Sequence, residues 1–395
     1  MIRVGVIFGG ESVEHEVSII SAVQAMNKMD TEKYEIIPIY ITKDREWYTG
    51  ESLKDIDVYQ DLELLKRYSK NVVLYAKGGR FILQSKGFFK RTIKEVDMVF
   101  PIVHGTNMED GVLQGYLRSI GIPFVGSDVS SAAVSQDKIF QKQIFKDEDL
   151  PLTSFVWFFD TEYLDDPDAI IKKIEKIKYP VIVKPATLGS SVGIAVAHNK
   201  EELQKSIEDA INYDNKIVVE EVVENLVEVN ISVLGNYEHI NLSEIEQVMS
   251  DNDLLTYEDK YIGGNKKTGR ASKGMASAAR KIPADIPEKM KEEVQEIATR
   301  AFRALNSSGV VRIDFLIDKK KKKVYINEIN SCPGSLAFYL WEPTGKDYSC
   351  LLDDMINIAI KDYKKRINKI HSFNSNILQG FAGSKGMKGL KGLKK

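Results

Sequence analysis

Strand-like and helix-like patterns alternate through the first third of the sequence. Residues 3–8 and 36–41 are short β-branched runs typical of strands, and the segment between them carries apolar residues at helical spacing. A further strand is expected over 96–103. Because parallel strands need a crossover between them, this alternation indicates a parallel sheet flanked by helices. It predicts a mixed α/β fold that begins with a parallel-sheet domain over 1–135, in which the charged stretch 43–95 is an irregular peripheral insertion.

The pattern changes near residue 136. Helices and strands follow over 136–225, where we expect a second, smaller domain. Residues 226–371 form the third expected domain, which includes a long polar stretch at about 250–284. The last segment, 372–395, is rich in glycine and lysine, with five lysines and no acid. It is predicted to be a disordered tail, with weak contact to an anionic partner as the alternative.

Composition excludes several classes of protein. The formal charge of −2 over 395 residues gives no overall attraction to nucleic acid or to a membrane surface. No apolar run approaches the ~20 residues of a membrane-spanning helix, and two cysteines cannot form a disulfide framework in so long a chain. The chain starts with a strand-like segment and no signal-peptide pattern. We therefore expect a cytoplasmic protein with small-molecule partners, and neither nucleic acid nor membrane among them.

Two strand patterns near the C-terminal end predict a β-hairpin. They are 310–318 (VVRIDFLID) and 324–330 (VYINEIN), and five lysines join them. If the turn is centred on Lys321, antiparallel pairing places Asp314 opposite Glu328. A shift of one residue in this register would move one strand's polar side chains to the other face of the sheet.

The same register places Arg312 opposite Asn330, on the face that carries the two acids. Two carboxylates opposite each other in a sheet repel unless a cation or proton lies between them. Asp314, Glu328 and Asn330 offer the hard oxygen ligands that Mg²⁺ prefers, and they are our predicted metal site. Arg312 could then stabilise charge on a transferring group. The alternative is a solvated face with an exposed ion pair, which would contribute little to stability.

A Gly-Ser loop follows a β-branched strand pattern that ends with Lys184. The loop spans 188–193 (LGSSVG). Glycines let backbone N–H groups approach phosphate oxygens, and the hydroxyls of Ser190 and Ser191 add further donors. The loop is not a Walker A motif, because that motif opens into a helix. We predict a flap over a nucleotide, with a plain hairpin turn as the alternative. Lys184 and Lys138, the latter at the start of a helix pattern, are the candidate phosphate ligands.

Five motifs together resemble the D-alanine–D-alanine ligase family of ATP-grasp enzymes. They occur in the family's order and are GGESVEHEVS at 9–18, HGTNMEDGVLQG at 104–115, VKPATLGSSVG at 183–193, YEDKY at 257–261, and RIDF with NEINSCPG at 312–334. The resemblance covers about residues 1–370. It implies an ATP-grasp fold with a Rossmann-like N-terminal domain, a nucleotide between the second and third domains, and a lid at about 250–284.

The resemblance implies an ATP-dependent ligase that forms D-alanyl-D-alanine, a peptidoglycan precursor. ATP would phosphorylate the carboxylate of the first amino acid, and the amine of the second would attack the acyl phosphate. Two Mg²⁺ ions, or Mn²⁺ in their place, would be the metal cofactors, and the enzyme would be a homodimer. The alternatives are an ATP-grasp ligase with a different amino acid or peptide as acceptor, and a non-catalytic nucleotide-binding regulatory protein.

The resemblance also assigns residues to the nucleotide. Glu221, Val222 and Val223 would line an adenine pocket. Glu228 would accept hydrogen bonds from the ribose hydroxyls, and Lys260, in the lid, would contact the phosphates. Closure of the lid would exclude water that could hydrolyse the acyl phosphate.

Further residues are assigned to the amino-acid substrates. By the resemblance, Glu14 would grip the ammonium group of the first amino acid, and His104 would lie in the same pocket. Glu14, Ser190 and Tyr261 match a hydrogen-bonded trio that ties the flap loops to the N-terminal domain. Arg312 would contact the reacting groups.

The segment after the last motif departs from the family pattern. The family has a short polar segment there, which supplies a serine and an apolar residue to the second substrate. This chain reads SLAFYLWEPTG from residue 335 onward. We place Gly334, Tyr339 and Leu340 beside the second substrate. The second pocket could therefore take a different amine; the alternative is that the aromatic residues simply pack in a core.

Overall fold

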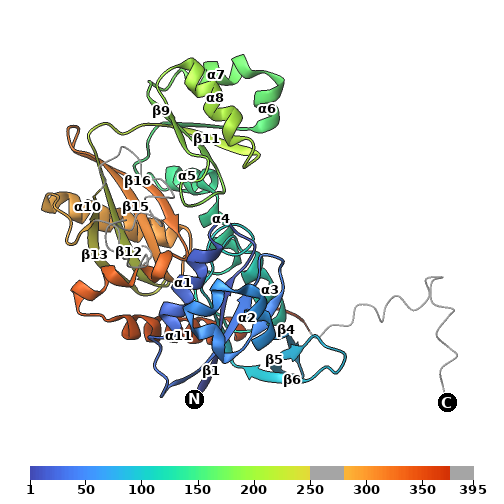
Figure 1. The fold of residues 1–395 in the computed structure, drawn as a ribbon. Helices are drawn as coiled ribbons and strands as arrows, with labels where there is room; N and C mark the ends of the chain where they lie inside the picture. Colours follow the sequence, from blue (N-terminus) through green and yellow to red (C-terminus); the bar gives the residue numbers. More distant parts are fainter. Residues whose placement is uncertain (250–279, 374–395) are drawn as a thin grey trace.

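The computed structural model describes residues 1–249 and 280–373, which form three sheets (Figure 1). The N-terminal sheet has seven strands in the order β6-β5-β4-β3-β2-β1-β7. Its strands are β1 (Ile2–Gly9), β2 (Tyr34–Ile41), β3 (Trp47–Thr49), β4 (Lys70–Lys77), β5 (Arg80–Ser85), β6 (Thr92–Val96) and β7 (Met98–Pro101). The associated helices are α1 (His15–Met26), η1 (Glu51–Lys54), η2 (Ile56–Gln60), α2 (Leu62–Tyr68), α3 (Val112–Ile120) and α4 (Val129–Gln136).

Strand β1 lies inside this sheet and is buried on both faces. It pairs in parallel with β2 and with β7. Side chains alternate along a strand, and here Val4, Val6 and Phe8 enter one apolar core with α1, while Ile7 enters a second core with α3. The predicted parallel sheet flanked by helices is therefore confirmed for this part of the unit.

The stretch 43–95 is not irregular, as we had expected, but extends the sheet. It contributes β3, β4, β5 and β6, which pair antiparallel with one another and with β2. On β4, buried Val72 and Leu74 alternate with partly buried Val73 and Tyr75, and the exposed charged residues of β4 and β5 lie at the strand ends. The charges at the ends hid this period-2 pattern, because only one face of an outer antiparallel pair needs to be apolar. The strand expected over 96–103 is limited to β7.

The second sheet has four antiparallel strands in the order β10-β9-β11-β8, and it forms the upper lobe in Figure 1. Its elements are β8 (Phe155–Phe159), α6 (Asp160–Asp165), α7 (Pro167–Ile174), β9 (Val181–Pro185), β10 (Ala195–Ala197), α8 (Lys200–Ala210) and β11 (Lys216–Glu221). One apolar core joins the sheet to α7 and α8. The Gly-Ser loop therefore connects two paired antiparallel strands, as the sequence predicted.

The third sheet has five antiparallel strands in the order β14-β13-β12-β15-β16. Its elements are β12 (Leu226–Gly235), β13 (Ile240–Val248), β14 (Arg280–Lys281), α10 (Glu288–Ala304), β15 (Gly309–Asp318) and β16 (Lys323–Asn330). We had not predicted β13. Helix α5 (Lys138–Asp147) packs here too, since Phe145 belongs to the core of this sheet. The Gln141 side chain on α5 bonds both backbone groups of Ile329, at 2.8 Å and 3.2 Å, so α5 is fixed to β16.

The C-terminal segment returns to the N-terminal unit. It comprises η4 (Gly334–Leu340), η5 (Glu342–Thr344) and α11 (Tyr348–Ile367). Trp341, Leu351 and Leu352 share one apolar core with β1 and α1. Residues distant in sequence therefore meet beside the β15–β16 hairpin. The domain boundaries drawn from the sequence stay predictions, and the glycine- and lysine-rich end and most of the predicted lid lie outside the described residues.

Candidate active site

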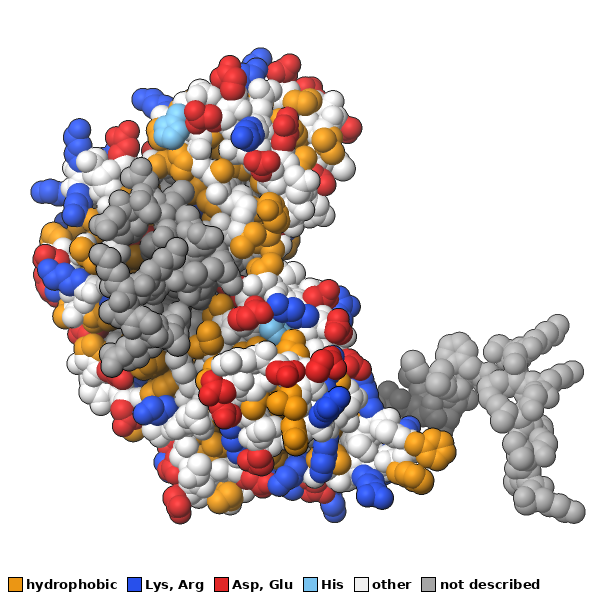
Figure 2. All heavy atoms as spheres, viewed as in Figure 1, with side chains coloured by type: hydrophobic (Ala, Val, Ile, Leu, Met, Phe, Trp, Pro, Cys, Tyr) orange, Lys and Arg blue, Asp and Glu red, His pale blue; other side chains and the backbone are white. Residues whose placement is uncertain are grey.

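A cavity of about 730 Å³ lies between the four-stranded and five-stranded sheets. Figure 2 shows the molecule hollowed between its upper lobe and the rest. Ten residues predicted from the sequence line this cavity: Lys138, Lys184, Ser190, Ser191, Glu221, Val222, Val223, Glu228, Asp314 and Glu328. The predicted phosphate, adenine, ribose and metal contacts are therefore brought to one place by elements from both sheets and from α5.

The β15–β16 hairpin has the predicted pairs at the site. Asp314 lies opposite Glu328, and Arg312 lies opposite Asn330. The turn itself is shorter than we expected, because Asp318 pairs with Lys323. A β-bulge inserts the unpaired Asn327 next to Glu328 and so restores the predicted register. The bulge also brings Asn327 into the cavity lining.

The hairpin face is partly buried and charge-balanced rather than fully solvated. Arg312 makes a two-pronged contact with Asp314, from Nε to Oδ1 at 2.6 Å and from Nη2 to Oδ2 at 2.7 Å. The Asn330 amide donates to the same carboxylate at 3.2 Å. Lys138 Nζ lies 3.6 Å from Glu328 Oε2. Two cations therefore offset the repulsion between the two opposed acids, and the side chain of Asp314 is 8% exposed.

The residues present fit a hard divalent cation. The carboxylates of Asp314 and Glu328 line the cavity, and Asn330 contacts Asp314 from the same hairpin face, so that two carboxylates and an amide form the oxygen-rich donor set that Mg²⁺ takes together with water and phosphate. The set contains two acids only. In the described part of the chain, no three His, Cys, Asp or Glu side chains gather as a ready metal cage. The arrangement suits an ion that shares its ligands with a phosphorylated substrate.

A buried cluster of charged residues supports Lys184. Glu220 lies between two ammonium groups, at 2.9 Å from Lys142 and 3.0 Å from Lys184, and its carboxylate also accepts the Thr153 hydroxyl at 2.9 Å. Burial alone would raise the pKa of Glu220, but the two ammonium groups lower it well below its usual range. Burial lowers the pKa of Lys142. Lys184 also donates to Asn327 at 3.3 Å, which holds its ammonium group at the cavity wall.

Sequence reasoning missed three residues of this cluster. Lys142 follows Lys138 by one helical turn, and that spacing could have placed both on one face of α5. Glu220 is the last residue but one of β11, whose alternation could have shown that its side chain points inward. Asn327 gave no signal, because its position in the site depends on the bulge.

The flap loop contacts the N-terminal unit. The Ser190 hydroxyl donates a hydrogen bond to Glu14 Oε1. Ser190 and Ser191 have φ values of 54° and 62°, in the left-handed region that residues with a Cβ rarely adopt. A Cβ atom on Gly189 would lie 2.7 Å from the Glu14 carboxylate, so a larger residue would require the Glu14 side chain to move. Lys138 Nζ donates to the Leu188 carbonyl at 2.6 Å.

His104 supports the loop that begins the predicted second-substrate segment. Its Nδ1 lies 2.7 Å from the Cys332 carbonyl, and its Nε2 lies 3.1 Å from the Ser21 hydroxyl, which also accepts the backbone N–H of Ser335. Burial lowers the pKa of His104 to about 4. A neutral ring that donates from Nδ1 and accepts at Nε2 satisfies every contact. His104 therefore holds this loop in place through its hydrogen bonds.

Glu109 is a buried acid that we had not assigned. It accepts hydrogen bonds from the backbone of Cys332 at 2.8 Å, the Ser331 hydroxyl at 3.0 Å and the backbone of Gly105 at 3.1 Å. Burial, together with the charge of Glu14, raises its pKa to about 7. It lies in the second of the five sequence motifs, where it gave no separate signal. Its hydrogen bonds tie the motif that contains His104 to the end of β16.

The predicted second-substrate residues lie within η4, a segment with an unusual backbone. Ser335, Leu336 and Ala337 have φ values of 52°, 53° and 48°, and consecutive left-handed residues other than glycine are costly. Tyr339 donates to Glu246 at 3.2 Å. Leu340 is fully buried in a small apolar cluster, so its side chain has a packing role.

Glu246 organises the neighbourhood of Tyr339. Its carboxylate accepts from Asn230 at 3.0 Å and from Arg280 at 3.1 Å, and the Arg280 guanidinium lies 3.9 Å from the centre of the Tyr339 ring. Burial raises the pKa of Tyr339 to about 12, so its hydroxyl stays protonated and can donate.

Burial also raises the pKa of Cys332, which argues against a nucleophilic thiolate.

Two predicted site residues, Lys260 and Tyr261, lie outside the described residues. Seven further predicted residues do not line the large cavity: Glu14, His104, Arg312, Asn330, Gly334, Tyr339 and Leu340. Glu14, Arg312 and Asn330 contact residues that do line it, namely Ser190 and Asp314. No helix in the described ranges is long and apolar enough to cross a membrane.

Comparison with known proteins gives a consistent result. Residues 3–127 match the family description "D-ala D-ala ligase N-terminus", and residues 144–357 match "D-ala D-ala ligase C-terminus". The chain is 38% identical over 380 residues to the D-alanine--D-alanine ligase of Thermosipho melanesiensis, with 96% of this chain and 99% of the relative covered. It is also 38% identical over 378 residues to that of Thermoanaerobacter pseudethanolicus, with 92% and 98% covered.

Solved structures share the fold. The D-alanine-D-alanine ligase from Coxiella burnetii superposes with a TM-score of 0.78 at 27% identity, and 93% of this chain and 96% of that chain are covered. The VanG D-Ala:D-Ser ligase from Enterococcus faecalis has a TM-score of 0.75 at 30% identity, with 91% and 99% covered.

Proposed function

The chain belongs to the D-alanine–D-alanine ligase family, and we propose that it joins two D-alanine molecules at the expense of ATP, as the names of its relatives describe. The products would be D-alanyl-D-alanine, ADP and phosphate, and the dipeptide would supply peptidoglycan synthesis. The observation that carries this proposal is the pair of opposed acids on the hairpin, Asp314 and Glu328, at the wall of a cavity that also holds Lys138 and Lys184.

We place ATP in the large cavity. Val222 and Val223 follow β11 and offer an apolar edge for adenine, and Glu228 lies on the same wall for the ribose hydroxyls. Lys184 and Lys138 are positioned for the phosphates, and Ser190 and Ser191 line the same cavity, where the predicted flap would cover them. Lys184 keeps its place because the Glu220 carboxylate and Asn327 hold its ammonium group.

Asp314, Glu328 and Asn330 would hold Mg²⁺, in one or two ions, with Mn²⁺ as a substitute. When bound, the metal would neutralise charge on the phosphates and orient the γ-phosphoryl group. Arg312 would be shared between Asp314 and the carboxylate being phosphorylated. A carboxylate is a poor electrophile until its oxygen becomes part of a phosphate leaving group, so this charge stabilisation is the main task of the site.

The first D-alanine would lie between Glu14 and the segment that His104 supports. Glu14 would pair with its ammonium group while still accepting the Ser190 hydroxyl, so that binding of substrate and position of the flap depend on each other. Neutral His104 adds no charge next to that ammonium group. Lys260 and Tyr261 would complete the enclosure from the lid.

The second amino acid would bind near Gly334 and Tyr339. D-serine is a second candidate acceptor, because VanG, at 30% identity, is described as a D-Ala:D-Ser ligase. The Tyr339 hydroxyl and the Glu246 cluster offer polar partners near this position, where a side-chain hydroxyl could be bound. We also propose that the enzyme is cytoplasmic and works as a homodimer.

One assay tests the proposal. Purified protein with Mg-ATP is given D-alanine, D-serine, L-alanine or pairs of them, and phosphate release and product mass are measured. We expect D-alanine alone to support release and to give the dipeptide. Phosphate release that requires another amine would identify that amine, and not D-alanine, as the acceptor. Nucleotide binding without phosphate release for any amino acid would favour a regulatory protein.

A further inference from the structure

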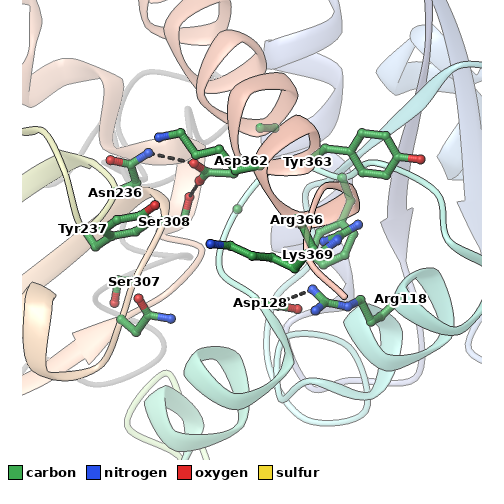
Figure 3. A pocket seen from close by; sticks show the side chains of 15 residues that line it. Arg118, Asp128, Asn236, Tyr237, Ser307, Ser308, Asp362, Tyr363, Arg366 and Lys369 are labelled. Atoms are coloured by element: carbon green, nitrogen blue, oxygen red, sulfur yellow. Dashed lines mark hydrogen bonds and ion pairs between the residues drawn. The ribbon is translucent and has the colours of Figure 1, made fainter. Parts of the chain in front are cut away.

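A second cavity, of about 250 Å³, lies where the end of α11 meets the N-terminal unit and the β12–β13 turn (Figure 3). Its walls come from α3, the start of α4, the loop before β15 and the last turns of α11. Among the described residues, its lining shares no member with that of the nucleotide cavity. The proposed ligation makes no use of it.

The acidic side chains of this cavity are already engaged. Asp362 accepts hydrogen bonds from Asn236 at 2.7 Å and from Ser308 at 3.0 Å. Asp128 forms an ion pair with Arg118, as the dashed line in Figure 3 shows. The lining contains four basic residues, Arg118, Lys365, Arg366 and Lys369, of which Lys365 is paired with Glu238 outside the cavity, so that Arg366 and Lys369 form no ion pair with any of the described residues. The cavity therefore carries an excess of positive charge.

Arg366 has the clearest need for an anion. Its guanidinium carbon lies 5.2 Å from the centre of the Tyr363 ring and 5.9 Å from that of Phe124. Within the described part of the chain, no carboxylate comes within 4 Å of its side-chain nitrogens. Burial, followed by the positive charge of nearby Arg118, lowers the pKa of Arg366, and the negative charges of Asp128 and Asp362 only partly offset this. Two guanidinium groups near each other are stabilised by an anion between them.

We propose that this cavity binds a small molecule through a phosphate group held by Arg366, Arg118 and Lys369. A guanidinium presents paired N–H donors that match two phosphate oxygens, whereas a lysine adds a mobile point charge. Ser307 lies on the opposite wall as a further donor. The volume is below the ~300 Å³ at which pockets for drug-sized ligands begin, so the ligand is inorganic phosphate or a small phosphate ester.

The position of the cavity gives such a ligand a structural effect. The loop 306–308 on its wall runs directly into β15, which carries Arg312 and Asp314. The backbone N–H of Ser308 donates to Ser127 Oγ at 3.1 Å, so this loop is already joined to the start of α4. A phosphate between α11 and α3 would brace the same junction, and we expect it to raise the thermal unfolding midpoint.

Calorimetric titration of the full chain tests the site. Inorganic phosphate and glycerol 3-phosphate are each titrated into wild type, Arg366→Gln, Lys369→Gln and the control Lys364→Gln, at constant ionic strength set with chloride. Lys364 is an exposed residue of the same helix that does not line the cavity. We expect saturable binding to wild type and control, and binding about tenfold weaker in the other two variants. Tighter binding of glycerol 3-phosphate would assign the site to an ester, and equal or weaker binding would assign it to free phosphate.

Phosphate is also a product of the proposed reaction, so a second binding event at the nucleotide cavity is expected and should be the same in all four proteins. The proposal is overturned if neither compound gives saturable heat with wild type, or if both cavity variants bind as wild type does. Circular dichroism establishes folding of each variant. Lys369 is exposed, so its replacement tests the site even if Arg366→Gln does not fold.

Discussion

The carboxylate of Glu14, at the start of α1, accepts a hydrogen bond from the hydroxyl of Ser190, in the loop between β9 and β10. These residues are 176 positions apart, and they lie beside different sheets, Glu14 at α1 of the N-terminal unit and Ser190 in the β9–β10 loop of the second sheet. Ser190 holds a left-handed backbone conformation to make the contact, with a φ of 54°. The nucleotide flap and the proposed site for the first amino acid are therefore coupled through one hydrogen bond.

Replacing Ser190 with alanine should lower kcat/KM for the first amino acid by about 10- to 100-fold. A hydrogen bond to a charged group contributes about 1.5–3 kcal/mol, and loss of this one would free the flap from Glu14. Steady-state kinetics with varied D-alanine measures the effect. The exposed hydroxyl of Ser119, on α3, provides a control, and Ser119→Ala should match wild type. Unchanged kinetics for Ser190→Ala would show that the contact has no part in catalysis.

Glu328→Gln should reduce turnover by about a thousandfold or more with every amine, while the thermal midpoint changes little. The amide removes the charge that a metal ion needs but keeps the shape of the side chain. Phosphate release at saturating Mg-ATP is the measurement, with Glu296→Gln on the outer surface of α10 as the control. A variant that keeps more than a tenth of wild-type turnover would exclude Glu328 as a metal ligand.

Lys142→Met should cost both stability and nucleotide affinity. Removing one partner of a buried ion pair costs about 3–5 kcal/mol, and we expect about 3 kcal/mol because Lys184 still faces Glu220. Lys184 would shift toward Glu220 and away from the phosphates, so KM for ATP should rise about tenfold. Chemical unfolding and kinetics measure the two effects. Lys146→Met, one turn further along α5 and exposed, should alter neither by a measurable amount.

Glu109→Gln should remove a pH dependence of stability. The folded protein holds the pKa of Glu109 at about 7, above its ordinary value of 4.5. Between those pH values the unfolded chain has released the proton and the folded chain keeps it, so the free energy of unfolding falls as pH rises through this window. The loss for this group would reach about 3 kcal/mol at most. Thermal midpoints of the variant and wild type should coincide near pH 4.5, separate as pH rises from 4.5 to 7 because wild type loses stability, and keep a constant separation above pH 7. Parallel curves would contradict the assignment.

The β15–β16 hairpin shows how far sequence reasoning reached. Alternation and the five-lysine turn correctly predicted that Asp314 faces Glu328 and that Arg312 faces Asn330. The predicted strand register is correct at the site but wrong next to the turn. The turn is shorter than predicted, and the bulge at Asn327 shifts the register back before Glu328. Bulges depend on how two strands twist against their neighbours, and a single strand pattern does not contain that information.

The stretch 43–95 shows the opposite case. Its charged residues suggested an irregular insertion, yet it forms four strands of the N-terminal sheet. Edge and half-buried strands tolerate charges on their outer face, so composition alone did not indicate them. Strand β13 was missed for a similar reason, since it mixes buried Ile245 with polar residues such as Glu246 that are buried only in the folded protein.

The sequence by itself determined the family, the α/β class and ten of the residues that line the large cavity, because these depend on local period, glycine placement and ordered motifs. Only the tertiary structure decided the supporting contacts. Lys142 behind Lys184, Glu109 beneath the end of β16 and Arg366 facing Arg118 each join segments that are far apart along the chain. These charged side chains come close to their partners only when the three sheets and α11 pack together. Burial in the packed structure then shifts their pKa values.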